Sequence, residues 1–517
     1  MKINRVQNAS RNVFFGIIFK IFSTVMPFVT RTVMIYYMGA KYLGLDGLFT
    51  SVLQVLNLAE LGVGNAMVFS MYKPIAEDDS KTICALMNLY RKYYRIIGVV
   101  IGIGGLALSP FIPLLVKDTI PDELNLYILY FMNLGVTVFS YWLYAYKNSL
   151  LIAYQRDDVS SKIGMSVMLF KYIAQCLVVF LTHNYYLYLF LTLISQIIVN
   201  IVTSITVSKL FPQYKPDGKL QEEEEQSINH RIRDVFTMKL GGTIVGSADT
   251  IVISSFLGLT VLYAYQNYYF IMNALLGFIT IFFSATIAGI GNGLVVDTPE
   301  KNYQNYRRFT FIISWIATVG TVCLAGLYQR FIKIWAGEEA LFGDGVMLLF
   351  CLYFYLFVIQ QMTCVYKDAG GIWHSDRFRP LTSGLFNLAM NLLLVKFWGI
   401  YAIILSTVCS YLFVAMPWLI HNVFSLIFKR SPKEFVGFLF KHFVITLLLT
   451  LSCFRMSIFV PYNGFTGLII CAVICVIVSN VVMVLIYHNT DVYRSMLSIA
   501  RGVFEGKISA VKKKFIK

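Results

Sequence analysis

The stretch NVFFGIIFKIFSTVMPFVTRTVMIYY at residues 12–37 decides the class of fold. A basic segment, MKINRVQNASR at residues 1–11, precedes it. A transmembrane helix needs about 20 consecutive, mainly apolar residues. This run is too long for the apolar core of a signal peptide, and no small-residue cleavage site closes it. It therefore predicts a first transmembrane helix and not a removable leader.

The whole chain has the same character as this stretch. Of its 517 residues, 58% are apolar and 14% are charged, against about 45–50% and 25% in soluble domains. We expect an all-α polytopic membrane protein. The sequence predicts fourteen transmembrane helices, near residues 12–37, 43–70, 96–116, 126–144, 163–182, 186–207, 238–258, 262–294, 309–328, 345–363, 380–396, 399–420, 442–460 and 464–487.

Basic residues set the predicted orientation. With the N-terminus inside, the inner segments hold 34 of the 43 Lys and Arg residues, the outer segments hold six, and three lie within spans. Cytoplasmic loops of membrane proteins carry an excess of Lys and Arg. We therefore expect a multi-pass protein of a bacterial cytoplasmic membrane, with both termini in the cytoplasm.

The net charge of +16 has the same explanation, so it does not indicate nucleic-acid binding. The nine cysteines are an odd number without a CxxC pair, which argues against a disulfide framework. The six histidines have no metal-ligand spacing, so we expect no metal and no cofactor. The short connections also leave no room for a soluble catalytic domain.

An internal repeat relates the two halves of the chain. The matching pairs are LGVGNAMV at 61–68 with AGIGNGLV at 288–295, YKN at 146–148 with YKD at 366–368, and Gly39 with Gly258. The period is six helices. An even number returns the chain to the same side of the membrane, so the repeats are parallel. Two six-helix lobes around a central cavity are typical of a transporter that works by alternating access.

This repeat gives the predicted domain boundaries. They are an N-lobe at 1–207, a cytoplasmic linker at 208–237 read as a solvated loop, a C-lobe at 238–425, two extra helices at 426–490, and a tail at 491–517. The tail is cationic and amphipathic. We expect it to lie on the inner leaflet, and a solvated tail is the alternative.

Charges within the spans are the main functional signal, since a charge in hydrocarbon costs at least ~2.5–3.5 kcal/mol. Lys20 and Arg31 lie eleven residues apart on the first helix, which places them on one face and about 16 Å apart. Such a basic stripe suits an anionic head group, and snorkelling to the two interfaces is the alternative. Pro27 lies between them and is a candidate hinge.

Three further charges lie within predicted spans: Lys171, Glu60 and Asp249. Lys171 adds a third cation to the candidate substrate site. Glu60 and Asp249 either couple transport to H⁺ or Na⁺, or form structural ion pairs. The residues alone do not decide between these two roles.

Six stretches resemble the Wzx-type polysaccharide-export flippases of the MATE-like MOP superfamily. They are RTVMIYYMG at 31–39, LGLDGLF at 43–49, ELGVG at 60–64, YKPIA at 72–76, ADTIVISSFLG at 248–258 and DRFRPL at 376–381. The resemblance covers residues 10–425, and the last two helices are an appendage. It implies a MATE-like fold without enzymatic activity.

The resemblance also implies a function. It is the transfer of an undecaprenyl-pyrophosphate-linked oligosaccharide across the membrane for capsule, exopolysaccharide or O-antigen assembly, coupled to an ion gradient. Implied partners are this substrate, membrane lipids, and a polysaccharide polymerase with other assembly proteins. Related lipid II flippases carry an arginine cluster in the first lobe, whereas here the first helix holds only Arg31 and Lys20. The alternatives are a cation-coupled multidrug antiporter of the same superfamily and a membrane-embedded polymerase.

Overall fold

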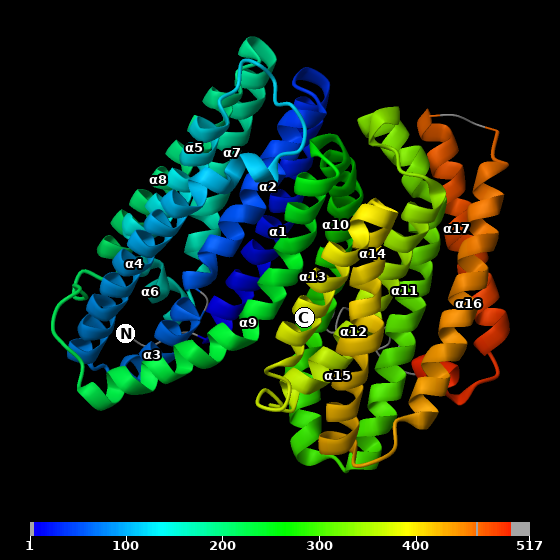
Figure 1. Cartoon of the computed structure of the whole chain (residues 1–517). Coiled ribbons are helices and arrows are strands. Elements are labelled where there is room, and N and C mark those ends of the chain that lie inside the picture. The colour runs from blue at the N-terminus through cyan, green and yellow to red at the C-terminus, as the bar shows by residue number, and fades with distance from the viewer. Residues whose placement is uncertain (1–4, 61, 462–463, 498–517) are drawn as a thin grey trace, which may run out of the picture. The chain divides into compact units, whose positions relative to one another are not determined.

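The computed structural model describes residues 5–60, 62–461 and 464–497, and every regular element in these ranges is helical (Figure 1). The elements are α1 (Arg5–Tyr37), α2 (Ala40–Leu56), η1 (Asn57–Glu60), α3 (Val63–Ala76), α4 (Ser80–Leu108), η2 (Ser109–Leu115), α5 (Leu126–Trp142), η3 (Ala145–Lys147), α6 (Asn148–Ala153), α7 (Asp157–Thr182), α8 (Tyr185–Leu210), α9 (Glu222–Phe256), α10 (Leu259–Val296), α11 (Pro299–Ala336), η4 (Glu338–Ala340), α12 (Asp344–Ala369), α13 (Arg379–Trp398), α14 (Ile400–Cys409), η5 (Ser410–Ala415), α15 (Met416–Val423), η6 (Phe424–Phe428), α16 (Lys433–Ile458) and α17 (Gly464–Tyr487).

The prediction of an all-α polytopic membrane protein is confirmed. Among the described residues, ten helices are long and apolar enough to cross a membrane, or eleven if the bent pair of α5 with η3 and α6 is one span. Large apolar side chains such as Phe170, Phe397 and Phe413 are exposed. Such side chains are unfavourable in water but suit a lipid-facing surface. The count of fourteen spans stays a prediction.

The predicted helix at 43–70 is broken in the structure. α2 ends at Leu56, the 3-10 turn η1 follows, and α3 begins at Val63. Gly62 has φ = +97°, a conformation that residues with a side chain rarely adopt. A Cβ atom there would also lie 2.9 Å from the Ile232 carbonyl oxygen. The break therefore brings α3 close to α9 and needs glycine at this position.

A second break follows α5, at the end of the predicted helix at 126–144. Tyr144 has φ = +62°, and the helices on either side of this turn are bent by 47°. The short helix α6 follows, between the helices predicted at 126–144 and 163–182. Residues at both breaks, among them Glu60 and Tyr144, line one cavity of unit 1.

The prediction of a solvated loop at 208–237 is wrong for its second half. α8 continues to Leu210, and α9 begins at Glu222. The four glutamates at 222–225 form the first turn of α9. Negative charge is favourable there because the positive end of the helix dipole lies at the N-terminus.

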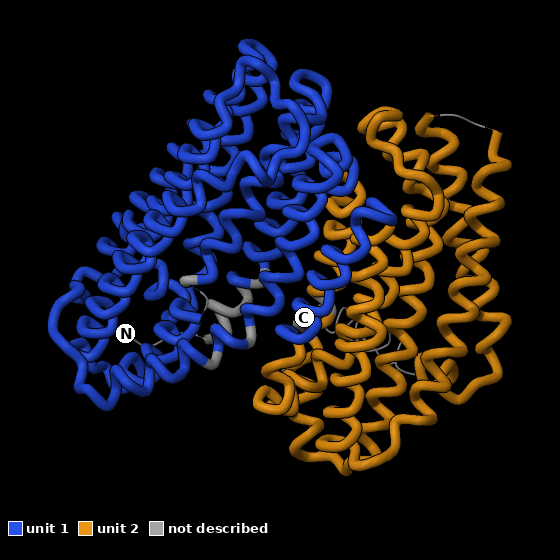
Figure 2. The backbone as a smooth tube through the Cα atoms, viewed as in Figure 1, with its two compact units in different colours: residues 1–266, 380–400 blue, residues 267–379, 401–517 orange. Residues whose placement is uncertain are grey.

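The described chain divides into two compact units, shown in Figure 2. Unit 1 contains residues 1–266 and 380–400, and unit 2 contains residues 267–379 and 401–517. The predicted lobes are defined by an internal repeat and not by packing, and their boundaries stay a prediction. One local feature agrees with the repeat: Gly39 and Gly258, which precede α2 and α10, have φ values of +96° and +103°.

Ion pairs and helix packing hold unit 1 together. α1 packs on α7, α7 on α8, and α5 on both α4 and α8. At the start of α7, the fully buried side chain of Asp158 pairs with Arg11, Arg156 and Lys162 at 2.7, 3.0 and 3.2 Å. One carboxylate thus fixes the first part of α1 against α7.

In unit 2, α11 packs against α12, α16 and α17. The apolar core here includes Phe311, Leu449 and Tyr487. Val492, Tyr493 and Met496, from the start of the predicted tail, also pack on this core. These partly buried side chains thus contact protein, and the position of the tail on the inner leaflet stays a prediction. The rest of the tail, residues 498–517, lies outside the described residues.

Candidate functional site

Three charged side chains from three helices of unit 1 lie near one another. Arg31 comes from α1, Asp46 from α2 and Lys171 from α7. All three are partly buried, and the Asp46 carboxylate interacts electrostatically with both cations. We call these residues the Arg31 cluster. Its formal charge is +1, because two cations share one carboxylate.

Aromatic side chains surround the Arg31 cluster. The Tyr185 hydroxyl donates a hydrogen bond to Asp46 Oδ1 at 3.4 Å, and Tyr188 stacks on Tyr185. Lys171 Nζ lies 4.1 Å from the centroid of the Tyr172 ring. A cation over an aromatic face regains part of the stabilisation it loses on leaving water. These contacts keep charge inside the unit at reduced cost.

The structure brings together two of the three predicted substrate cations, Arg31 and Lys171. Lys20 is exposed on α1, and no contact among the described residues joins it to the Arg31 cluster. α1 runs through Pro27 as one continuous helix, and the hinge role of Pro27 stays a prediction. Asp46, which we did not select from the sequence, replaces Lys20 as the third charge.

Glu60 lies at the break between α2 and α3. Its carboxylate accepts hydrogen bonds from the Tyr94 hydroxyl, at 3.3 Å, and from the backbone amide of Gly64. It also interacts electrostatically with Lys239 on α9. A carboxylate at the start of α3 stabilises the exposed amides of the first turn. Glu60 thus contacts the first turn of α3 and also lines a cavity, and its role in ion coupling stays a prediction.

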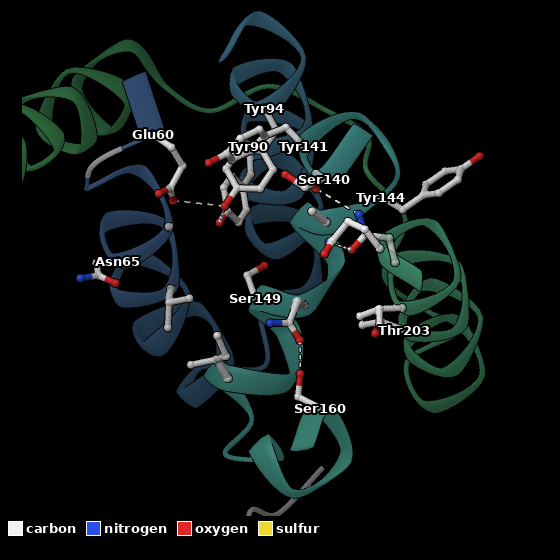
Figure 3. Close-up of a pocket in the computed structure, with 18 of the residues that line it drawn as sticks. Glu60, Asn65, Tyr90, Tyr94, Ser140, Tyr141, Tyr144, Ser149, Ser160 and Thr203 are labelled. Atoms are coloured by element: carbon white, nitrogen blue, oxygen red, sulfur yellow. Dashed lines mark hydrogen bonds between the residues drawn. The ribbon is translucent and has the colours of Figure 1, made fainter. Parts of the chain in front are cut away.

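This cavity has a volume of about 670 Å³ and lies inside unit 1 (Figure 3). We call it the Glu60 cavity. Its polar wall consists of hydroxyl and amide side chains from α3, α5, α6, α7 and α8: Asn65, Ser140, Asn148, Ser149, Ser160, Gln196, Asn200 and Thr203. Its aromatic wall consists of Phe69, Tyr72, Tyr90, Tyr94, Tyr141 and Tyr144.

Hydrogen bonds order the aromatic wall beside Glu60, where Figure 3 shows three tyrosines gathered. The Tyr90 hydroxyl donates to the Tyr94 hydroxyl at 2.7 Å, and Tyr94 donates to Glu60. The Tyr141 hydroxyl donates to Asn57 Oδ1 at 3.2 Å. On the opposite wall, Ser160 donates to Asn148 Oδ1 at 2.6 Å. A connected network of this kind holds its rings in place before a ligand binds.

Asp249 lies elsewhere in unit 1, buried in α9. The Asn391 amide donates to its Oδ1 at 2.7 Å, and the Tyr265 hydroxyl donates to its Oδ2 at 3.2 Å. Asn387 lies one turn before Asn391 and accepts a hydrogen bond from it at 3.3 Å. These partners are neutral oxygen and nitrogen groups. Among the described residues, no group of three or more His, Cys, Asp or Glu side chains could hold a metal ion.

Comparison with known proteins establishes the fold. The chain is similar to the lipid II flippase MurJ in an inward closed conformation, with a TM-score of 0.65 and 14% identity over 91% of this chain and 99% of MurJ. It is also similar to an inward-facing multidrug resistance MATE family transporter of the MOP superfamily, with a TM-score of 0.59 and 14% identity over 79% and 96% of the two chains.

The eukaryotic MATE transporter AtDTX14 gives a TM-score of 0.57 at 11% identity, over 82% of this chain and 97% of that chain. No family model matches the sequence, and no curated protein matches it. The MATE-like fold that we expected is confirmed. At these identities the likeness concerns the fold alone.

Proposed function

We propose that this protein is a flippase for an undecaprenyl-pyrophosphate-linked oligosaccharide. In this proposal it moves the lipid-linked repeat unit from the inner to the outer leaflet of a bacterial cytoplasmic membrane, for capsule, exopolysaccharide or O-antigen assembly. A polymerase and other assembly proteins then take over the product. The protein acts as a transporter and not as an enzyme.

The observation that carries this proposal is the Arg31 cluster. A pyrophosphate diester carries negative charge that must leave water during transfer. Arg31 offers a planar fork of donors for phosphate oxygens, and Lys171 offers a mobile point charge. Asp46 balances one of the two cations while the substrate is absent. The net charge of +1 then favours an anionic head group.

The fold supports a lipid-linked substrate, since one protein with this fold is named a lipid II flippase. The chain differs from the arginine-rich pattern of lipid II flippases, because Arg31 is the only arginine among the predicted spans of the first two helices. We therefore favour another lipid-linked oligosaccharide over the peptidoglycan precursor.

Asp249 is our candidate for coupling transport to an ion gradient. Asn391 and Tyr265 hold its carboxylate in place, and oxygen groups of this kind suit H⁺ or Na⁺. Substituting Asp249→Asn removes the charge and keeps the shape. If Asp249 couples transport, this variant should transport at a rate that no longer responds to the ion gradient. An unchanged response would assign Asp249 a structural role.

A multidrug antiporter is the second candidate, because MATE transporters share the fold and the Glu60 cavity contains an acid among aromatic rings. The net positive charge of the Arg31 cluster argues against it, since a cationic drug would be repelled. A polymerase is a weaker alternative, because the connections between helices are short.

The proposal is tested in cells that lack the gene. The wild-type protein should restore surface polysaccharide, whereas Arg31→Ala with Lys171→Ala should restore little and should accumulate lipid-linked intermediates on the inner leaflet. Membrane insertion of each variant is measured by immunoblotting. Wild-type polymer levels in the double variant would contradict the role of the cluster. Altered drug susceptibility with normal polysaccharide would favour the antiporter.

A further inference from the structure

We infer that the Glu60 cavity is a carbohydrate-binding site for the sugar portion of the transported substrate. The inference rests on the proposed function for the link between sugar and lipid, but the site itself follows from the chemistry of its walls. Four observations carry it: the size of the cavity, its charge, its polar groups and its aromatic rings.

The size fits a small oligosaccharide. A volume of about 670 Å³ lies in the range of about 300–1,000 Å³ that is usual for small-molecule sites. The walls come from six helices of one compact unit, so the space does not depend on any contact outside that unit. The ordered network of Tyr90, Tyr94 and Glu60 forms one wall before a ligand arrives.

The charge of the lining residues disfavours phosphate and argues against a cation. None of the described lining residues is Lys, Arg or His, and Glu60 is the single acid among them. Two cations lie over lining rings, Arg231 over Phe69 and Lys147 over Tyr144, but the only charged group in the described lining itself is the Glu60 carboxylate, which would repel a pyrophosphate group. An organic cation would compete with existing partners, since Glu60 already interacts with Tyr94, the Gly64 amide and Lys239.

The polar wall matches a ligand with many hydroxyl groups. Hydroxyl and amide side chains both donate and accept hydrogen bonds, and so does each hydroxyl of a sugar. Ser149, Gln196 and Thr203 present such groups from α6 and α8. Several of these side chains already donate to protein groups, as Ser149 does to the Tyr146 carbonyl oxygen, and a hydroxyl oxygen that donates can still accept a hydrogen bond from a sugar hydroxyl.

The aromatic wall matches the apolar faces of sugar rings. Sugar rings expose C–H groups on their faces, and these pack well on the negative face of an aromatic ring. Tyr72 lines the cavity and is 46% exposed, so part of its side chain is available to a ligand, whereas the Tyr144 ring points away from the other labelled residues (Figure 3). The combination of flat aromatic rings with neutral hydrogen-bonding groups is what a sugar needs.

The position of the cavity also separates it from the Arg31 cluster. Glu60 lies fourteen residues after Asp46, which corresponds to roughly 20 Å along the helix direction. One pyrophosphate group cannot reach both. The cavity therefore holds another part of the substrate, and the oligosaccharide is the part whose chemistry it fits.

The test uses purified full-length protein in lipid nanodiscs and free, neutral oligosaccharides without phosphate or lipid. The probes are di-, tri- and tetrasaccharides of the maltose and chitin series and galactose-containing oligomers. Saturation-transfer difference NMR detects protein contact with the C–H protons of a sugar. We expect a signal from at least one probe, with the largest transfer to ring protons.

Matched variants locate the signal. Tyr72→Ala removes an exposed ring and should weaken binding at least fivefold, whereas Tyr72→Phe keeps the ring and should stay within twofold of the wild type. Tyr141→Ala and Tyr141→Phe repeat the comparison at a second ring of the aromatic wall, should a Tyr72 variant fold poorly. Tyr127→Ala is the control, because Tyr127 is an exposed tyrosine of α5 outside the cavity lining.

Glu60→Gln separates a sugar from a cation. The amide still donates and accepts hydrogen bonds, so sugar binding should fall by no more than about threefold. Loss of all binding in this variant, or binding of ethidium in place of every sugar probe, would overturn the inference. So would the absence of signal from all probes at 50 mM, or equal effects of Tyr72→Ala and Tyr127→Ala.

The outcome is independent of the proposed flippase activity. Sugar binding that depends on Tyr72 but is unaffected by Arg31→Ala supports the site even if transport of the lipid-linked substrate fails. Transport that continues in a protein without any sugar binding would overturn the site and leave the flippase proposal intact.

Discussion

The Arg31 cluster and the Glu60 cavity lie in the same compact unit and differ in chemistry. Arg31, Asp46 and Lys171 place three charges among tyrosines, whereas the cavity lining holds one acid among neutral hydroxyls, amides and rings. Phosphate needs charge, and sugar needs neutral hydrogen bonds and flat apolar surface. In our two proposals, recognition of a lipid-linked sugar is divided between these two places.

The two sites also differ in what stabilises them. Charges inside a membrane protein need partners, and Asp46 supplies one for both Arg31 and Lys171. The cavity is instead lined by residues at both helix breaks, such as Glu60 and Tyr144. Substitutions in both sites and in a third charged site test this contrast, from the largest expected effect to the smallest.

The largest effect is expected from a third charged site, which we regard as structural. Asp158→Asn leaves Arg11, Arg156 and Lys162 without their shared carboxylate. Removing one partner of a buried ion pair costs about 3 kcal/mol, and we expect the low end because the three cations are partly exposed. The thermal unfolding midpoint of purified protein should fall clearly.

The control for this variant is the rate of transport of several substrates, each divided by the amount of folded protein. Asp158→Asn should lower transport of all substrates in proportion to the amount of folded protein. Loss of transport of one substrate at unchanged stability would show that the group of Arg11, Arg156 and Lys162 also binds substrate. Charge recognition would then not be confined to the Arg31 cluster.

Arg31→Ala should lower transport by about tenfold to a hundredfold. A hydrogen bond to a charged group contributes about 1.5–3 kcal/mol, and each 1.4 kcal/mol corresponds to a factor of ten. Initial rates of transfer in proteoliposomes give the measurement. Arg31→Lys keeps the charge without the fork and should retain intermediate activity.

Equal activity of Arg31→Ala and the wild type would remove the Arg31 cluster from the account. Equal loss in Arg31→Lys and Arg31→Ala would show that the geometry of the guanidinium matters more than its charge.

Asp46→Asn should strengthen the binding of an anionic ligand, and this change should be smaller than the loss caused by Arg31→Ala. The formal charge of the cluster rises from +1 to +2, so affinity for inorganic pyrophosphate should increase about threefold, in line with modest pair energies. Isothermal titration of purified protein measures this affinity. Asp46→Glu keeps the charge and is the control. Weaker pyrophosphate binding in Asp46→Asn would contradict the assigned charge balance.

Lys20→Ala should have the smallest effect. Lys20 is exposed, and its backbone lies about 16 Å from that of Arg31 along the helix, beyond a Debye length of about 8 Å. Transport should stay within twofold of the wild type. A loss of transport as large as that of Arg31→Ala would instead support the prediction that Lys20 and Arg31 bind the substrate together.

Much of the fold could be predicted from the sequence, because apolar runs of membrane length leave few alternatives to a helix. The predicted helix at 464–487 coincides with α17. The breaks at 57–62 and 144 could not be predicted in the same way. Each depends on one residue with positive φ, and hydropathy does not report backbone conformation.

The candidate site was partly predictable. Arg31 and Lys171 are conspicuous as cations in apolar runs, and Asp46 carries the same signal within the predicted span at 43–70. The pairing of these residues depends on how α1, α2 and α7 pack. The cavity tyrosines could not be selected, since the chain contains 33 Tyr and 42 Phe residues without a pattern that marks these few.

The central claim is that this protein transfers a lipid-linked oligosaccharide by means of the Arg31 cluster. Purified protein in liposomes with a fluorescent undecaprenyl-pyrophosphate-linked oligosaccharide tests it most directly, through the fraction that becomes accessible to an external quencher. We predict rapid transfer by the wild-type protein and a loss of at least tenfold with Arg31→Ala and Lys171→Ala combined. No transfer by the wild-type protein, or equal transfer by both, would contradict the claim.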